Sequence, residues 1–481
     1  MPNENENKNK TPDRAPAATR NFHAIDFDRK LIESLPQQGP RYTSYPTADR
    51  FLDSFGPDDY AKALGDRALD PERKPLSLYI HVPFCSVACF YCACNKIATK
   101  DHSKAEQYLG YLEKEMALVR PKIKGNTELE QLHFGGGTPT FLNDEQFDRV
   151  FAMIRSNFKM ADDGEYSIEI DPRKVGKQTV RHLAQLGLNR MSVGIQDFDP
   201  KVQAAVNRVQ SVEETFSVIE AAREAGFKSV SVDLMYGLPH QTVETVEKTL
   251  LRALQASPDR LALYHYAHLP HIFMPQRRID AAAVPDSPTK MDILQRAVEI
   301  LTEKGYVFIG MDHFAKPDDE LAIALGEGKL QRNFQGYSTH AECDLIGLGV
   351  SSIGKVGDNY IQSYRDLESY YAKLDQGVLP VMRGYALSRD DALRRSVIQA
   401  LMCRFALDFK EFEDQYGIVF KDYFEVEMAE LGLMQKTGLV KLEDGGARVT
   451  DKGRFVIRNI AMVFDWHLRN RKTKATYSKT V

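Results

Sequence analysis

From about residue 75 the sequence alternates short β-rich runs with amphipathic helical patterns, and this alternation limits the possible fold more than any other feature. Helical patterns such as SKAEQYLGYLEKEMALVR and SVEETFSVIEAAREAGF separate the β-rich runs. Strands that alternate with helices form parallel sheets with right-handed crossovers. The pattern predicts an α/β fold, either an open doubly wound sheet or a partial barrel, and periodicity alone does not separate the two. The six expected strands cover residues 76–82, 129–134, 165–170, 189–195, 227–234 and 260–266.

The alternation stops after residue 380. The stretch DDALRRSVIQALMCRF (390–405) places Leu393, Val397 and Leu401 on one helical face. The stretch LVKLEDGGARVT (439–450) predicts a hairpin around Gly445 and Gly446, followed by a helix from Thr450. We interpret this region as a small, mostly helical C-terminal domain. It is either a winged-helix DNA reader or a lid or packing domain, and the near-neutral charge of the chain favours the second.

Composition excludes several classes of protein. The chain has 481 residues, enough for two or three domains, and its hydrophobic (43%) and charged (27%) fractions are typical of a soluble globular protein. The formal charge of -4 provides no basic field for nucleic acid or an anionic membrane. No apolar run reaches the roughly 18 residues that a membrane span needs. The polar N-terminus lacks the apolar core of a signal peptide, and six cysteines are too few for a disulfide framework, so we expect a cytoplasmic protein.

Four of the six cysteines lie together in HVPFCSVACFYCACNKI (81–97), directly after the first expected strand. Loops that follow the strands of a parallel sheet are where ligands bind. A structural zinc ion would need Cys94 as a fourth ligand, but one residue separates Cys92 from Cys94, whereas zinc pairs usually have two to four between them. An iron-sulfur cluster with three thiolates leaves one iron open, and the spacing Cys-x3-Cys-x2-Cys favours it. In that case Cys94 is a neighbouring thiol and not a ligand.

The cysteine spacing, with Tyr91 before the last cysteine, resembles the radical S-adenosylmethionine (SAM) superfamily. The glycine-rich segment HFGGGTPT (133–140) after the second expected strand is similar to a superfamily segment whose bare backbone approaches the methionine amino group. The resemblance implies a partial (β/α)6 TIM-like barrel and a [4Fe-4S] cluster held by Cys85, Cys89 and Cys92. It also implies that the open iron binds SAM and that a low-potential electron releases a 5'-deoxyadenosyl radical.

Several further stretches resemble the oxygen-independent coproporphyrinogen III oxidase family: GPRYTSYPTA, YIHVPFC, CNKI, SIEIDPR, VDLMYGLP and RNFQGYST. The related haem-chaperone branch differs at CNKI and RYTSYPT. The resemblance implies oxidative decarboxylation of two propionates of coproporphyrinogen III to vinyl groups, giving protoporphyrinogen IX. It also implies a low-potential electron donor such as flavodoxin or ferredoxin. Two alternatives are a haem-chaperone-like member of the superfamily without oxidase activity, and a zinc-stabilised interaction protein that binds nucleic acid.

The resemblance also assigns cofactor contacts. Tyr79, Gly136 and Glu169 match positions that contact the cluster-bound SAM. The alternation of the third strand agrees, because Glu169 shares a face with Ser167 while the isoleucines between them point the other way. The family is also described with a second SAM molecule. The residues that match its surroundings are Tyr91, Gly137, Thr138, Gln196, Arg208, Asp233, Ala267 and Ile353.

Catalytic and substrate residues are less constrained by the sequence. Tyr79 and His81 alternate along the first strand and share a face beside the cluster, so we predict both as active-site residues, with His81 a proton donor or cluster neighbour. The implied substrate carries four carboxylates, which need cationic partners. We predict Arg41, Arg332 and Lys96 for this role.

The expected domain organisation has four parts. A disordered polar tail covers residues 1–22, and an N-terminal segment over the barrel mouth covers 23–72. The radical SAM barrel is expected over 73–375 and the C-terminal domain over 376–481. We expect a monomer that neither binds nucleic acid nor spans a membrane.

Overall fold

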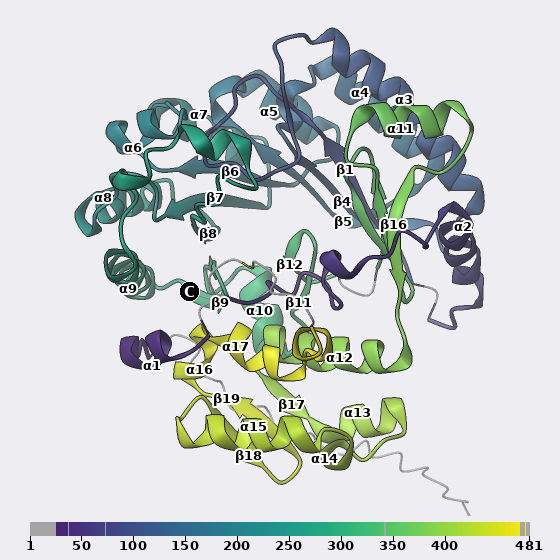
Figure 1. The fold of residues 1–481 in the computed structure, drawn as a ribbon. Coiled ribbons are helices and arrows are strands. Elements are labelled where there is room, and N and C mark those ends of the chain that lie inside the picture. The colour runs from purple at the N-terminus through teal and green to yellow at the C-terminus, as the bar shows by residue number, and fades with distance from the viewer. Residues whose placement is uncertain (1–25, 37, 73, 341–342, 472–476, 478–481) are drawn as a thin grey trace, which may run out of the picture.

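The computed structural model describes residues 26–471, except 37, 73 and 341–342, together with residue 477. The expected polar tail, 1–22, lies outside the described residues. One large sheet dominates the fold (Figure 1), and its twelve strands follow the order β16-β15-β14-β13-β1-β4-β5-β6-β7-β8-β10-β9. The two ends of this order do not pair with each other, so the sheet is curved but open.

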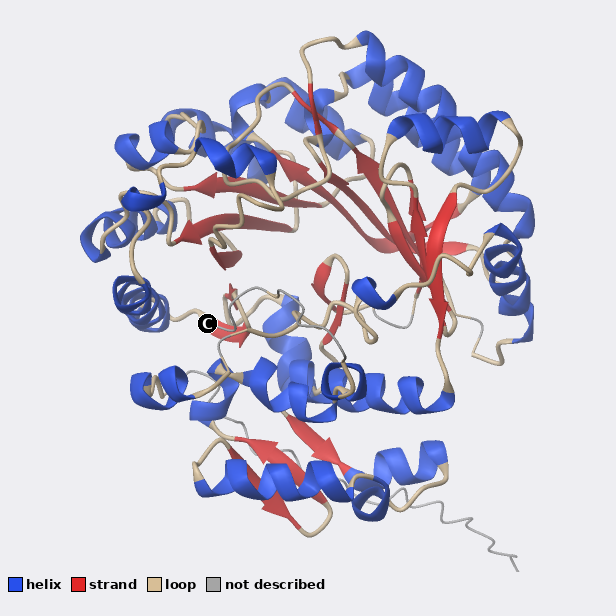
Figure 2. Cartoon of the chain, in the orientation of Figure 1, coloured by secondary structure: helices blue, strands red, loops and turns tan. Residues whose placement is uncertain are grey.

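The centre of the sheet consists of parallel strands in the order in which they occur in the chain. They are β1 (Leu76–Val82), β4 (Glu128–Gly136), β5 (Lys159–Ile170), β6 (Arg190–Gln196), β7 (Ser229–Tyr236) and β8 (Arg260–His265). The intervening helices cover only the outer, convex face (Figure 2). A doubly wound sheet would have helices on both faces, so the α/β partial barrel is confirmed. The longer of these helices are α3 (Ser103–Val119), α4 (Asp144–Asn157), α5 (Lys177–Gln185), α7 (Val212–Glu224), α8 (Val243–Leu254) and α9 (Ser287–Glu303).

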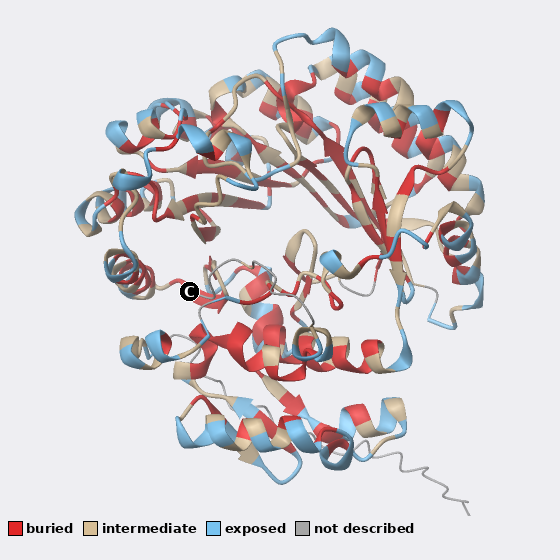
Figure 3. Ribbon diagram, in the orientation of Figure 1, coloured by how far each residue is buried: buried red, intermediate tan, exposed pale blue. Residues whose placement is uncertain are grey.

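Local sequence explains where several of these helices begin. Asn143, Ser211 and Thr242 each accept a hydrogen bond from the backbone three residues later, and a side chain at that position returns it. Apolar residues of the strands and helices then pack between the sheet and the helical layer, where Phe134 and Phe151 are fully buried. Figure 3 shows this buried layer following the whole arc of the sheet.

Strands at both edges of the sheet were not predicted. β13 (Asp344–Leu348) pairs with β1 in parallel, and β14 (Ile353–Val356), β15 (Asn359–Ser363) and β16 (Val381–Ala386) follow in antiparallel pairs. At the other edge β10 (His313–Ala315) pairs with β8, and β9 (Val307–Gly310) pairs with β10. The sheet therefore continues beyond residue 375, and the first helix of the C-terminal part is α12 (Arg389–Arg404).

The C-terminal part combines helices with a small antiparallel sheet ordered β17-β19-β18. Strands β18 (Val440–Glu443) and β19 (Gly446–Val449) form the predicted hairpin, and α16 (Asp451–Phe455) follows Thr450, which caps it. The remaining elements are β17 (Ala406–Asp408), α13 (Phe409–Tyr416), α14 (Phe420–Tyr423), α15 (Glu425–Lys436), α17 (Ile457–Ala461) and α18 (Trp466–Arg469).

The described N-terminal segment, with α1 (Arg29–Ser34) and α2 (Pro57–Asp66), connects the barrel to the C-terminal part. The Tyr42 hydroxyl donates to the Asp465 carboxylate at 2.9 Å, and the Tyr45 hydroxyl accepts from the Trp466 backbone N–H at 3.1 Å. Leu52 forms an antiparallel bridge with Gly384 in β16. RYTSYPT therefore lies between the two larger parts of the molecule.

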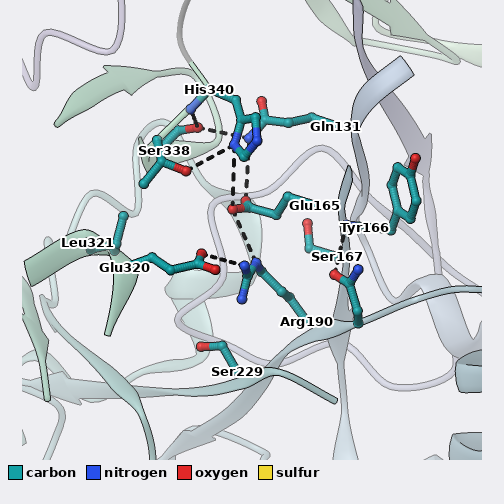
Figure 4. A network of polar contacts seen from close by, with 12 residues as sticks. Gln131, Glu165, Tyr166, Ser167, Arg190, Ser229, Glu320, Leu321, Ser338 and His340 are labelled. Atoms are coloured by element: carbon teal, nitrogen blue, oxygen red, sulfur yellow. Dashed lines mark hydrogen bonds and ion pairs between the residues drawn. The ribbon is translucent and has the colours of Figure 1, made fainter. Parts of the chain in front are cut away.

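A polar network closes the barrel interior at the end where the parallel strands begin (Figure 4). The Arg190 guanidinium lies between the carboxylates of Glu165, at 3.1 Å, and Glu320. Gln131 donates to the Ser338 hydroxyl at 2.8 Å.

Within the described ranges, no helix is long and apolar enough to cross a membrane.

Candidate active site

A cavity of about 260 Å³ lies where the parallel strands end, and the cysteine loop forms one wall of it. The loop starts at β2 (Phe84–Cys85) and ends at β3 (Ile97–Ala98), two short strands that pair in parallel. Backbone hydrogen bonds from Ile97 to Pro83 and from Thr99 to Cys85 fasten its two ends. Cys85, Cys89, Cys92 and Cys94 all line the cavity.

Two of the cysteine sulfurs have defined and unlike surroundings. Thr138 Oγ1 donates to Cys85 Sγ at 3.3 Å, but burial raises the pKa of the Cys85 thiol to about 11. Hydrogen bonding from Cys94 and the nearby Lys96 ammonium lower the pKa of Cys92 to about 5, and the Cys94 backbone N–H donates to Cys92 Sγ at 3.4 Å. These surroundings favour the thiolate at Cys92 and the thiol at Cys85, and metal binding favours the thiolate of both.

Two arginines approach the third sulfur. Arg208 Nη1 and Arg173 Nη2 donate to Cys89 Sγ at 3.5 Å and 3.6 Å, and Asp171 pairs with both guanidinium groups. Arg208 Nη2 also donates to the Gly194 carbonyl at 2.6 Å, and a Cβ on Gly194 would lie only 2.8 Å from that nitrogen. Gly194 therefore leaves the space that the Arg208 side chain occupies.

The glycine-rich segment forms the part of the cavity wall next to Cys85. Gly136 has φ of +113°, and a Cβ there would lie 2.7 Å from the His81 ring. A Cβ on Gly137 would lie 2.8 Å from the backbone of Pro83 and Phe84. Both positions require glycine, because the end of β4 packs directly on the segment that carries the first cysteine.

Two carboxylates extend the cavity into the barrel. Glu169 and Asp233 line both this cavity and a second cavity of about 160 Å³ further inside the barrel. Ser192 and Tyr264 also line both cavities. Burial raises the pKa of Asp233 to about 7, although Ser192 Oγ donates to it at 2.9 Å. The cysteine loop and the barrel interior thus form adjoining spaces.

Tyr79 and His81 lie behind the cavity wall. The Tyr79 hydroxyl lies 3.0 Å from His81 Nδ1, and His81 Nε2 lies 3.0 Å from the Asn95 carbonyl. Because that carbonyl only accepts, Nε2 carries the proton and Nδ1 accepts from Tyr79. Burial lowers the pKa of His81, which favours this neutral form. His81 therefore supports the turn at Asn95, and the Tyr79 ring lies against the Gly135 backbone next to Glu169.

The other predicted residues divide between the cavity and its surroundings. Gln196, at φ of +66°, lines the cysteine cavity, as do Tyr91, Thr138 and Lys96, whose ammonium donates to the Cys92 carbonyl at 3.3 Å. Six predicted residues are not in its walls: Tyr79, His81, Ala267, Ile353, Arg41 and Arg332.

Sequence reasoning missed several polar or close-packed residues of the cavity, among them Asp171, Arg173, Ser192 and Gly194. Ser192 and Gly194 lie on the same face of β6 as Arg190 and Gln196, so strand periodicity could have found them. Asp171 and Arg173 stand in the stretch SIEIDPR, but the contact of Arg173 with Cys89 joins segments far apart in the sequence.

These side chains suit an iron-sulfur cluster and an organic ligand beside it. Three cysteines face one cavity, and each of their sulfurs accepts a hydrogen bond from a nearby donor. Hydrogen bonds to sulfur are a main means by which proteins tune such clusters. The bare backbone of β4 and the carboxylates of Glu169 and Asp233 provide acceptors for amino and hydroxyl groups.

The fold and this cavity define a radical SAM protein. Residues 79–253 match the family model described as the radical SAM superfamily, and residues 387–456 match the model of the HemN C-terminal domain. The superfamily implies a [4Fe-4S] cluster and SAM as cofactors.

Curated relatives define the family more narrowly. The oxygen-independent coproporphyrinogen III oxidase of Escherichia coli (strain K12) is 48% identical over 95% of this chain and 99% of its own. The enzyme of the same name from Pseudomonas aeruginosa is 47% identical over 92% of this chain and 96% of its own. The solved structure of coproporphyrinogen III oxidase (HemN) from Escherichia coli, described as a radical SAM enzyme, matches with a TM-score of 0.88 and 47% identity over 92% of this chain and 99% of that one. The chain belongs to the family of oxygen-independent coproporphyrinogen III oxidases. The matches give no support to the haem-chaperone alternative.

Proposed function

We propose that this chain is an enzyme that oxidatively decarboxylates two propionates of coproporphyrinogen III to vinyl groups without oxygen, giving protoporphyrinogen IX. The observation that carries the proposal is the cavity in which three cysteines, the glycine-rich end of β4 and two carboxylates converge. A propionate β C–H bond is unactivated, and a general base does not remove its hydrogen at neutral pH. When bound, the cluster and SAM supply the strong hydrogen-atom abstractor that this bond requires.

The side chains have distinct tasks in this proposal. Cys85, Cys89 and Cys92 hold the cluster and leave one iron open to SAM. Glu169 and the Gly136 backbone bind the methionine moiety, and the Tyr79 ring beside them excludes water. His81 positions the turn at the end of the cysteine loop through the Asn95 carbonyl and contacts no reacting atom.

A second SAM molecule is part of the proposal. Tyr91, Gly137, Thr138, Gln196, Arg208 and Asp233 all line the cysteine cavity, and Asp233 also lines the inner one. Asp233 lies in the wall between the two cavities, where ribose hydroxyls would donate the hydrogen bonds that a buried carboxylate needs. We assign Ala267 and Ile353 to its periphery.

Further parts of the proposal concern partners and location. A low-potential donor such as flavodoxin or ferredoxin supplies electrons, and an acceptor removes one electron from the substrate as CO2 leaves. The enzyme works as a cytoplasmic monomer. Its C-terminal part packs on the N-terminal segment through Tyr42 and Asp465, which supports a role as a lid or packing domain rather than a DNA reader.

An anaerobic turnover experiment tests the proposal. The protein is reconstituted with iron and sulfide and then given dithionite, SAM and coproporphyrinogen III. We expect protoporphyrinogen IX together with 5'-deoxyadenosine. A cluster and 5'-deoxyadenosine without any vinyl product would refute the substrate. Stoichiometric haem binding without oxidation would favour a chaperone, and zinc in place of iron would refute the whole assignment.

A further inference from the structure

Three guanidinium groups gather around a single carboxylate between the barrel and the C-terminal part. Arg41 pairs with Asp312, which precedes β10. Arg332, in β11 (Gln331–Asn333), adds positive potential at Asp312 and His313, and Arg458, in α17, interacts electrostatically with Asp312. Arg458 donates to the carbonyls of Gly39 and Pro40 and so holds the segment that carries Arg41.

The charges at this place do not balance. Burial alone would raise the pKa of Asp312, but Arg41, His313 and Arg332 outweigh it, so the carboxylate stays ionised. Burial, followed by the charge of Arg332, lowers the pKa of His313 to about 3, so the imidazole is neutral at pH 7. One negative charge therefore faces three positive ones.

Among the described residues, none accepts a hydrogen bond from two of the Arg332 nitrogens. The residue is only 4% exposed, and its buried Nε and Nη1 atoms have no hydrogen-bond partner within the described ranges. The Arg332 guanidinium carbon lies 4.8 Å from the centre of the Tyr337 ring in β12 (Gly336–Ser338), so the ring covers one face of the guanidinium. The N–H groups point outward in the plane of the guanidinium, and a ring stacked on its face does not accept hydrogen bonds from them. A buried guanidinium with two open donors is costly unless a bound anion completes it.

The cation group borders the barrel interior. Tyr264, His313 and Tyr337 line the 160 Å³ cavity, with His313 in edge contact with both tyrosine rings. Arg41 lies over the Tyr264 ring at 5.9 Å, and Tyr264 also lines the cysteine cavity. Tyr264, His313 and Tyr337 therefore lie between the two cavities and the cations.

We propose that Arg332, with Arg41 beside it, binds the carboxylate of one of the two substrate propionates that are not converted to vinyl groups. The inference rests on the proposed function, since it takes a tetracarboxylate tetrapyrrole as substrate. The reacting propionate must lie at the cysteine cavity, and the propionates on the other pyrrole rings of the macrocycle then lie away from it. A planar guanidinium fork with two open N–H groups matches the two oxygens of a carboxylate.

Arg332→Met is the main test, because methionine keeps much of the volume and removes the buried charge. We expect KM for coproporphyrinogen III to rise about 10- to 100-fold, because the loss of one hydrogen bond to a charged group weakens binding by about this factor. Thermal stability should be unchanged or higher, because an uncompensated charge has gone. A purely structural arginine would instead lower stability and leave KM unchanged. Arg404→Gln is the matched control, since Arg404 pairs with Glu411 at the surface of the C-terminal part, and KM should stay within twofold.

Product binding shows which propionate is held. Protoporphyrinogen IX keeps the two unreacted propionates, so Arg332→Met should weaken its inhibition of the enzyme by a similar factor. Weaker substrate binding with unchanged product inhibition would overturn the proposal, as would an unchanged KM. Arg332→Lys keeps the charge and loses the fork; it should raise KM about 3- to 10-fold, and it decides the matter if the methionine variant does not fold. If the wild-type enzyme forms 5'-deoxyadenosine but no vinyl product, the proposed substrate is wrong. The Arg332 proposal, which depends on that substrate, is then refuted with it.

Discussion

Glu115 is a fully enclosed carboxylate in α3, and replacing it by glutamine should make the protein more stable at high pH. Glu115 Oε2 accepts from the Gly349 backbone N–H at 2.7 Å and from the Tyr370 hydroxyl at 2.6 Å. Burial raises its pKa from 4.5 to about 7, and these two hydrogen bonds oppose the shift only in part. Glutamine offers the same oxygen to both donors without a charge.

The magnitude follows from proton linkage. Between pH 4.5 and 7 the unfolded chain loses the Glu115 proton while the folded protein keeps it, so stability falls as pH rises through this window and then levels off. A shift of about 2.5 pKa units corresponds to about 3 kcal/mol, of which about 2 kcal/mol develops between pH 5.5 and pH 8. The free energy of unfolding of Glu115→Gln relative to the wild type should therefore rise by about 2 kcal/mol between these two pH values.

Urea unfolding of both proteins at pH 5.5 and pH 8 measures this difference. Glu113→Gln is the control, because Glu113 is on the same helix, exposed and paired with Arg149, and its removal should change stability by less than about 0.5 kcal/mol at either pH. A stability difference between Glu115→Gln and the wild type that is the same at both pH values, or a glutamine variant that is weaker at pH 8, would refute the reasoning about the buried charge.

Three further predictions concern the cavity. Replacing any of the three predicted cluster ligands by alanine should abolish the brown chromophore, whereas Cys94→Ala should keep it; bleaching of Cys94→Ala would show that the division into three ligands and one neighbour is wrong. Gly136→Ala should cost about 1–3 kcal/mol of stability from the positive φ and the clash with His81, and should reduce SAM binding measured by equilibrium dialysis; normal binding at normal stability would contradict the close approach. Asp233→Asn, which keeps the Ser192 contact and removes a carboxylate of pKa about 7, should weaken SAM binding more at pH 8 than at pH 6, and a pH-independent loss would argue against an ionised Asp233 as acceptor.

The sequence predicted the parallel centre of the fold well because strand and helix periods differ. β1 was predicted with its observed bounds, and the other five central strands within a few residues except at the start of β5. The antiparallel strands β14 to β16 were missed, since they are short and only one helix, α11 (Leu367–Asp375), interrupts them, so the regular strand-helix alternation does not mark them. The choice between barrel and open sheet depends on which face the helices cover, and that is a property of the whole sheet.

The candidate site shows the same limit. Strand alternation placed Glu169 on the inner face, where it lines both cavities. The same argument put His81 beside the cluster, but its ring instead packs on Gly136 and bonds to Asn95. The contacts of Arg173 with Cys89, and the charge imbalance around Arg332, arise between segments distant in sequence and follow only from the folded chain.

The central claim is that this cavity directs hydrogen abstraction to a propionate side chain of coproporphyrinogen III. The most direct measurement is anaerobic turnover with substrate deuterated at the propionate β-carbons, followed by mass spectrometry of the 5'-deoxyadenosine formed. The account predicts deuterium in 5'-deoxyadenosine in proportion to the vinyl groups produced. Vinyl product accompanied by unlabelled 5'-deoxyadenosine would contradict it.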